Sequence, residues 1–335
     1  MPTTLTNASA LVRVALTPRD LAIFQTLADA RFLTAAAIEW LHFPDRRPVW
    51  EADMQARMQT ACTEPYRIGR SVYRRLHLLV SAGYLYRLVR PIARLGHGGG
   101  REPDLYALSE RGADAVAMEQ DDPIDRASEF RQRPWSHMTT NHAAEIGDVY
   151  AALRVKIASM PGLAMEGWQH DVQLSRAYDQ VTVTRPLNGR MERVVLPVVP
   201  DGTFVLVHPR GRMRVFLEVD RGTRRTETWR EKIMAYQAYH GSPALHTRYG
   251  TQQFLVLAIA PSTVQQRRLM NATAAVVGGA SPRYLFTLRA AVHPLRIGAE
   301  WRRIAGITRT PVAVEGVGRM HERVEAVTEP HIFLQ

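Results

Sequence analysis

The stretch from Val198 to His240 most constrains what this 335-residue chain can fold into. Two runs of apolar residues are separated by a short polar turn, and a helical pattern follows them. We predict a first strand that carries Pro200-Asp201-Gly202 and a turn at His208 to Arg212. A second strand from Met213 to Leu217 runs into Glu218-Val219-Asp220, and a helix follows from about Thr226 to His240. A strand–turn–strand–helix unit of this kind is typical of α/β domains.

Acidic side chains gather in this unit. Because side chains alternate along a strand, Glu218 and Asp220 project from the same side, and Asp201 joins them if the two strands pair. The following helix carries Lys232, one of only two lysines beside 41 arginines. Three carboxylates near one lysine predict a site for a hard cation, Mg²⁺ or Mn²⁺, of the kind that cleaves phosphodiesters.

A simpler interpretation of the same residues stays open. An Asp-Gly pair is often only a turn, and short motifs match by accident. In that case the acids pair with neighbouring arginines such as Arg221, Arg224 or Arg225 and hold no metal.

The front of the chain has the order of a winged helix-turn-helix. Helices are predicted from Thr17, from Thr34 to about His42 and from Ile68 to Ala82, with a charged insertion at 44–65. A hairpin with a glycine-rich tip at 97–100 follows. In such folds the third helix enters the major groove and the hairpin touches the DNA backbone or minor groove.

Basic charge is concentrated in that region. The whole chain carries a formal charge of +11, and residues 65–111 hold nine arginines against three acids. A polyanionic partner is therefore expected. The predicted contacts to double-stranded DNA are Arg67, Arg70, Ser71, Arg74, Arg75, Arg94, His97 and Arg101. The alternatives are a solvated basic face, or a winged helix that contacts only proteins.

Together these features resemble two known groups. A winged-helix front half followed by PDG, LEVDRGT and a Lys-x-x-x-Tyr helix resembles the replication-relaxation family of plasmid and mobile-element proteins. Asp201 on one strand and Glu218 on the next resemble the PD-(D/E)XK nucleases, although Asp220 stands where those proteins have lysine. The resemblance implies that Lys232 substitutes from the helix, and that Glu145 faces the site from a preceding helix.

The predicted fold class is α/β, with an N-terminal winged helix-turn-helix followed by a PD-(D/E)XK-like mixed sheet flanked by helices. The domains are a winged helix at 16–120, a linker at 121–136, a nuclease-like domain at 137–295 and a C-terminal extension at 296–335. In the second domain we expect a helix at 139–159, strands at 166–174, 253–260 and 283–288, an irregular segment at 175–197 and a helix at 263–275.

Several function classes are disfavoured. The single cysteine, Cys62, rules out an intrachain disulfide and a cysteine-based zinc cluster. No apolar run is long enough to cross a bilayer, and neither a P-loop nor a Rossmann glycine motif is present. The first residues lack the pattern of a signal peptide, so a cytoplasmic protein is expected.

The resemblance implies a DNA-binding protein of plasmid or mobile-element replication, relaxation or mobilisation. If the protein is catalytic, Asp201, Glu218 and Asp220 hold Mg²⁺ or Mn²⁺, and Lys232 positions the attacking water or stabilises the developing charge while DNA is nicked or cut. One alternative is an inactive DNA-binding regulator; another is a scaffold for replication or DNA-transfer proteins. The sequence leaves the oligomeric state open.

Overall fold

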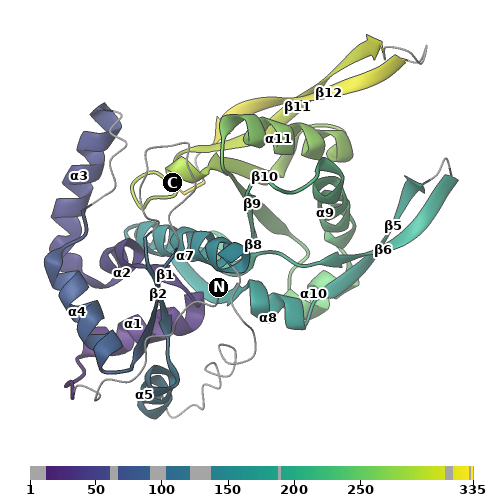
Figure 1. Ribbon diagram of the computed structural model, residues 1–335. Coiled ribbons are helices and arrows are strands. Elements are labelled where there is room, and N and C mark those ends of the chain that lie inside the picture. The colour runs from purple at the N-terminus through teal and green to yellow at the C-terminus, as the bar shows by residue number, and fades with distance from the viewer. Residues whose placement is uncertain are drawn as a thin grey trace. The chain divides into compact units, whose positions relative to one another are not determined.

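The computed structural model describes residues 13–60, 67–90, 103–120, 137–187, 190–313, 320–331 and 333–334. The chain divides into two compact units, Met1–Val155 and Lys156–Gln335. The predicted linker at 121–136 lies outside the described residues, as does the glycine-rich hairpin tip. Figure 1 shows the elements of both units.

The first unit combines helices with a small sheet. Its elements are α1 (Pro18–Ala30), β1 (Leu33–Thr34), α2 (Ala35–His42), the 3-10 helix η1 (Pro44–Arg46), α3 (Arg47–Thr60), α4 (Arg70–Ser81), β2 (Leu85–Leu88), β3 (Leu105–Leu108), α5 (Glu110–Gln120) and most of α7 (His137–Ala158). The strands form an antiparallel sheet in the order β1-β3-β2. The charged insertion predicted after α2 is mostly helix.

Local sequence explains where these helices begin and end. Thr17 and Asp20 form a capping box at the start of α1, with Pro18 in the first turn. Helix α4 buries Val72, Leu76 and Leu79 on one face and leaves its arginine-rich face exposed. Gly83 follows α4 with a φ of 75°, the left-handed conformation that ends many helices.

Helix α7 differs from expectation, because it groups with the first unit up to Val155 rather than with the second. Its Ala143 and Ala144 belong to a buried cluster with Phe32 and strand β3. A Cβ at Gly147 would lie 2.1 Å from the carbonyl oxygen of Phe32, so only glycine permits this approach. These small residues let the helix pack directly on the first unit.

The second unit is built on a mixed sheet of seven strands in the order β12-β11-β10-β9-β8-β7-β4. Strands β8, β9 and β10 run parallel, and the remaining pairs are antiparallel. The strands are β4 (Ala164–His170), β7 (Gly202–His208), β8 (Gly211–Val219), β9 (Phe254–Ala260), β10 (Ser281–Leu288), β11 (Trp301–Ala313) and β12 (Met320–His331). The remaining elements are α8 (Asp171–Arg176), α9 (Thr226–Tyr239), α10 (Pro243–Tyr249), α11 (Thr263–Val277) and the 3-10 helix η2 (Arg289–Ala291). The expected mixed sheet flanked by helices is confirmed.

The core of this unit lies between the sheet and helices α9 and α11. Strand β9, predicted at 253–260, is central and buried along most of its length. Trp229, Ile233 and Tyr236 form the inward stripe of α9, each at most 1% exposed. Tyr236 and Phe254 surround Phe216 of β8, with ring centroids 5.7 and 4.8 Å from it. Helix α9 is thereby fixed against β8.

The structure of this unit differs from three expectations. The segment expected to be irregular forms the antiparallel ribbon of β5 (Asp179–Leu187) and β6 (Arg190–Val198), which packs on α9. Residues 171–174, predicted as strand, lie in α8. The weakly patterned C-terminal region supplies β11 and β12, which continue the main sheet rather than forming a separate extension. Figure 1 shows both ribbons projecting beyond the helices.

Candidate functional site

Strands β7 and β8 bring Asp201 and Glu218 together, as their predicted pairing requires. Gly202 lies opposite Leu217 in the antiparallel register. The Asp201 amide donates to the Leu217 carbonyl at 2.9 Å, and the Val219 amide donates to the Asp201 carboxylate at 2.7 Å. Asp201 is thus held at the start of β7, beside the end of β8.

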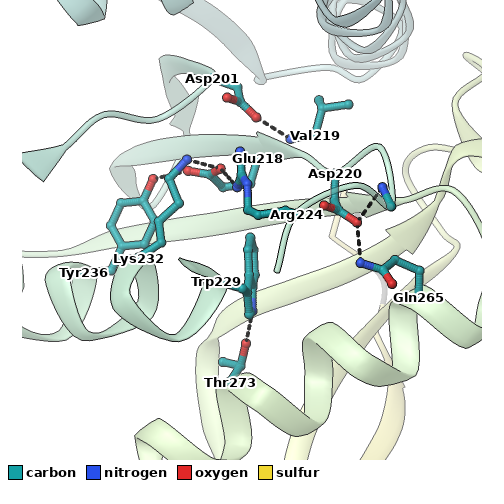
Figure 2. A network of polar contacts seen from close by, with 11 residues as sticks. Asp201, Glu218, Val219, Asp220, Arg224, Trp229, Lys232, Tyr236, Gln265 and Thr273 are labelled. Atoms are coloured by element: carbon teal, nitrogen blue, oxygen red, sulfur yellow. Dashed lines mark hydrogen bonds and ion pairs between the residues drawn. The ribbon is translucent and has the colours of Figure 1, made fainter. Parts of the chain in front are cut away.

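Glu218 is fully buried and faces helix α9 (Figure 2). Its carboxylate accepts hydrogen bonds from the Lys232 ammonium group and, at 2.5 Å, from the Tyr236 hydroxyl. These two donors are four residues apart and so share one face of α9. Arg224, in the loop before the helix, adds a contact at 3.4 Å. Lys232, Tyr236 and Arg224 thus all donate to the carboxylate of Glu218.

Burial dominates the electrostatics of this cluster. It raises the pKa of the Glu218 carboxyl above its ordinary value, and the Asp201 carboxylate adds to the rise while Lys232 and Arg224 oppose it. Burial also raises the pKa of Tyr236 well above 10.0, with Glu218 contributing. The pKa of Arg224 is raised, because the attraction of Glu218 and Asp201 outweighs the lowering by burial. The pKa of each group in the cluster therefore depends on the charges of the others.

Asp220 does not join the cluster around Lys232. One of its oxygens accepts from the Gly222 amide at 3.0 Å and from the Gln265 side chain of α11 at 2.7 Å (Figure 2). Its other oxygen is buried with no hydrogen-bond partner in the described structure. Within the ranges that the structure describes, no group of three or more His, Cys, Asp or Glu is arranged to hold a metal ion.

Some members of the site were not anticipated from the sequence. Tyr236 was not predicted as a site residue, although its spacing from Lys232 places both on one side of the helix. No sequence pattern indicates Gln265 as a site residue, because it lies 45 residues after Asp220 and reaches it only once α11 packs on the sheet. Glu145, predicted to face the acids, lies on α7 in the first unit, whereas the acids lie in the second.

The predicted DNA contacts of the first unit separate into three groups. Arg67, Arg70, Ser71 and Arg74 are exposed on or just before α4. Arg75 instead forms an ion pair with the buried Asp20 and donates to the Ala15 carbonyl at 3.1 Å. Three further predicted contacts lie outside the described residues: Arg94, His97 and Arg101. The exposed face of α4 also carries Tyr73 and His77.

Comparison with protein families gives one match. The model of the replication-relaxation family matches residues 24–254, which is more than half of the chain. The chain belongs to the replication-relaxation family. The region shared with this family includes α4 and the acidic cluster of β7, β8 and α9. No curated protein and no solved structure matches the chain.

The helices that the structure describes were also considered as membrane spans. None of them combines the length and apolar character needed to cross a bilayer.

Proposed function

We propose that this member of the replication-relaxation family binds double-stranded DNA and acts in the replication or relaxation of plasmids or mobile elements. The first unit acts as a winged helix, with α4 as the helix that enters the major groove. The observation that carries the proposal is the exposed face of α4, where Arg70, Ser71 and Arg74 project away from the buried Val72-Leu76-Leu79 stripe.

The architecture of the unit supports this role. Two helices and the charged insertion precede α4, and the β2–β3 hairpin follows it, as in winged helices. Arg75 pairs with Asp20 and so fixes α4 against α1. The neighbouring Arg70 and Arg74 make no part of this contact. An arginine can bind a phosphate with two parallel hydrogen bonds, so two or three on one helix favour a nucleic acid.

Salt-dependent binding by the full-length chain tests the proposal. Binding of a fluorescein-labelled mixed-sequence duplex is followed by anisotropy across a salt series. Replacing Arg70→Gln together with Arg74→Gln is expected to lower affinity and to reduce the slope of log K against log salt by about 2, at ~0.9 for each lost phosphate contact. The matched control replaces two exposed arginines of the second unit, Arg193→Gln with Arg210→Gln. If the wild-type protein does not bind DNA, a scaffold for replication or transfer proteins becomes the better interpretation.

A second candidate function is metal-dependent cleavage of DNA by a PD-(D/E)XK-like second unit. It is favoured by the buried Glu218–Lys232 pair next to Asp201. The strand order also supports it, since β4, β7 and β8 form an antiparallel run and β9 then lies parallel to β8 after α9.

The residues fit a metal ion only in part. The unpartnered oxygen of Asp220 is a free acceptor, but both oxygens of Glu218 already accept from protein donors. Asp201, Asp220 and Glu218 are the carboxylates that would hold Mg²⁺ or Mn²⁺, with Glu218 giving up one of its protein donors, and the bound ion would supply an activated water for hydrolysis. Lys232 would offset negative charge beside Glu218.

A nicking assay separates this candidate from an inactive regulator. Supercoiled plasmid is incubated with the protein and Mg²⁺ or Mn²⁺, and relaxed circles are quantified. An active site predicts nicking that Asp201→Asn abolishes while DNA binding persists. Binding without nicking in either metal would leave the regulator as the function.

A further inference from the structure

A pocket of about 350 Å³ lies in the second unit, between helices α9 and α11 and strand β12. The site described above does not include it. Its wall combines apolar with polar and basic side chains: Val264, Ala272, Ala275 and Val324 on the one hand, and Thr226, Arg230, Arg267, Arg268 and Asn271 on the other. Because no acidic side chain is found among the described residues that line it, the pocket is an electropositive recess.

Arg268 is held in position by the surrounding structure. Its Nε donates to the Thr226 hydroxyl at 2.7 Å, and its terminal nitrogens reach Gln265 Oε1 and the Arg224 carbonyl, each at 3.3 Å. None of these three acceptors carries a negative charge. The guanidinium is therefore ordered before any ligand arrives, while its positive charge remains uncompensated by them.

Asn271 adds a neutral donor to the same wall. Its Oδ1 accepts from the Ala326 amide of β12 at 2.9 Å. Because an N–H group needs an acceptor, this contact fixes the orientation of the side-chain amide, and its NH₂ group is left as a donor. The pocket thus offers amide as well as guanidinium hydrogens.

The other two arginines are at the surface. Arg267 is exposed, and the side chain of Arg230 is 46% exposed. The carboxylate that Arg230 meets is Glu227, at 3.7 Å and 73% exposed, so this surface pair is weak. Three guanidinium groups around one recess repel one another, and an anion placed among them relieves that repulsion.

The pocket lies next to the acidic cluster. Arg268 contacts the carbonyl of Arg224, whose guanidinium contacts Glu218 at 3.4 Å. Gln265, one turn before Arg268, donates to Asp220. Arg224 and Gln265 thus connect the pocket to the acidic cluster through direct contacts.

We infer that the pocket formed by Arg230, Arg267, Arg268 and Asn271 binds a backbone phosphate of DNA, as a second contact separate from α4. Guanidinium groups bind phosphate oxygens in pairs, and the amide of Asn271 supplies a further hydrogen bond. The inference rests on the proposed function, because it names DNA as the source of the phosphate. It assigns the second unit a direct part in holding the strand.

The test uses the full-length protein with Arg230→Gln and Arg267→Gln combined. Both side chains are at the surface, so melting temperature and circular dichroism are expected to match the wild type. Anisotropy is measured with the labelled duplex and with the single strand of the same sequence. Since the pocket is inferred to hold one phosphate, the expected result is a slope of log K against log salt reduced by about 0.9 for the duplex and about 0.7 for the single strand. The variant with Arg193→Gln and Arg210→Gln controls for net charge.

Each outcome decides between the two proposals. The pocket assignment is overturned if the pocket variant has the same slope as the wild type, or if the net-charge control lowers the slope by as much as the pocket variant does. Binding through α4 then stands. A reduced slope in the pocket variant, with no effect of Arg70→Gln and Arg74→Gln, supports the pocket and overturns the assignment of α4. Absence of DNA binding by the wild type overturns both.

Discussion

At the scale of single residues, the candidate site depends on a carboxylate that is removed from water. Glu218 is buried, and Lys232, whose side chain is 17% exposed, is the nearer of two cations that donate to it, the other being Arg224. Removing one partner of such a pair leaves the other charge uncompensated, which costs far more than the pair itself contributes. The pair is therefore a sensitive point for stability, whatever chemistry it serves.

Lys232→Met is expected to lower the free energy of unfolding by on the order of 3 kcal/mol, because it keeps the aliphatic stem but strips Glu218 of its ammonium donor. Urea denaturation at neutral pH measures the loss. Lys156→Met, at the other lysine of the chain, is the matched control and is expected to change stability by less than about 0.5 kcal/mol. Equal stability of both variants would show that Glu218 does not depend on Lys232.

A histidine of the first unit predicts a response to pH. Burial lowers the pKa of His42 to about 4, with the charges of Arg154 and Arg19 adding to the effect, and its ring lies 2.9 Å from the Thr26 hydroxyl. The unfolded chain binds this proton near pH 6.5, so the contribution of neutral His42 is fully present above that pH. It is lost as the pH falls from about 6.5 towards 4.

His42→Gln is therefore expected to flatten the acid side of the stability profile in this window, as followed by thermal melting at a series of pH values. His77→Gln, at an exposed position of α4, is the control and should leave the profile unchanged. A wild-type melting temperature that does not fall between pH 6.5 and 4 relative to His42→Gln would contradict the burial of a neutral ring.

Which site residues can be predicted from sequence depends on how local their contacts are. Asp201, Glu218 and Lys232 follow from strand pairing and helix phase within one continuous segment. The turn of Asp220 towards Gln265 depends on where α11 packs, which no short-range pattern encodes. The same holds for Arg75: on its helix it resembles Arg74, and only the fold pairs it with Asp20.

At the scale of elements, the packing of α7 depends on a single missing side chain. Gly147→Ala would place a Cβ 2.1 Å from the Phe32 carbonyl oxygen, so helix or loop must move. We expect a loss of roughly 1–3 kcal/mol, as for other overpacked positions. Gly279→Ala meets nothing within 4 Å and is the control. Guanidinium denaturation compares the two, and equal midpoints would mean that α7 does not make this approach.

The helices and strands that bury a whole face could be predicted from the sequence, and those that bury only a few residues could not. The apolar run of β9 and the stripe of α9 have the periodicity of buried structure, and both are found as expected. Strand β6 buries only Leu196 and Val198 and is otherwise largely exposed, so its residues appear merely polar. Strand β11 does bury Trp301 and Ile304, but the residues around them alternate too weakly for the sequence to predict a strand.

At the scale of the whole molecule, the exposed face of α4 proposed to bind DNA and the acidic cluster belong to separate units, so they are expected to respond separately to substitution. If the second candidate function holds, millimolar Mg²⁺ or Mn²⁺ raises the melting temperature of the wild type, because a bound ion stabilises the folded state. Asp201→Asn with Glu218→Gln should remove this rise and leave the salt-dependent binding of duplex DNA nearly unchanged. A wild-type melting curve that neither ion moves would refute the metal site.

The position of β12 at the end of the main sheet has a consequence for solubility at high concentration. An edge strand of this length presents unpaired backbone groups to which a strand of another molecule can add. Here the edge carries Glu325 and Glu329, and Pro330 has no N–H to offer. Glu329 is paired with Arg303 of β11, so it is the proline that interrupts any added ladder. The sheet is thereby protected against growing from one molecule into the next.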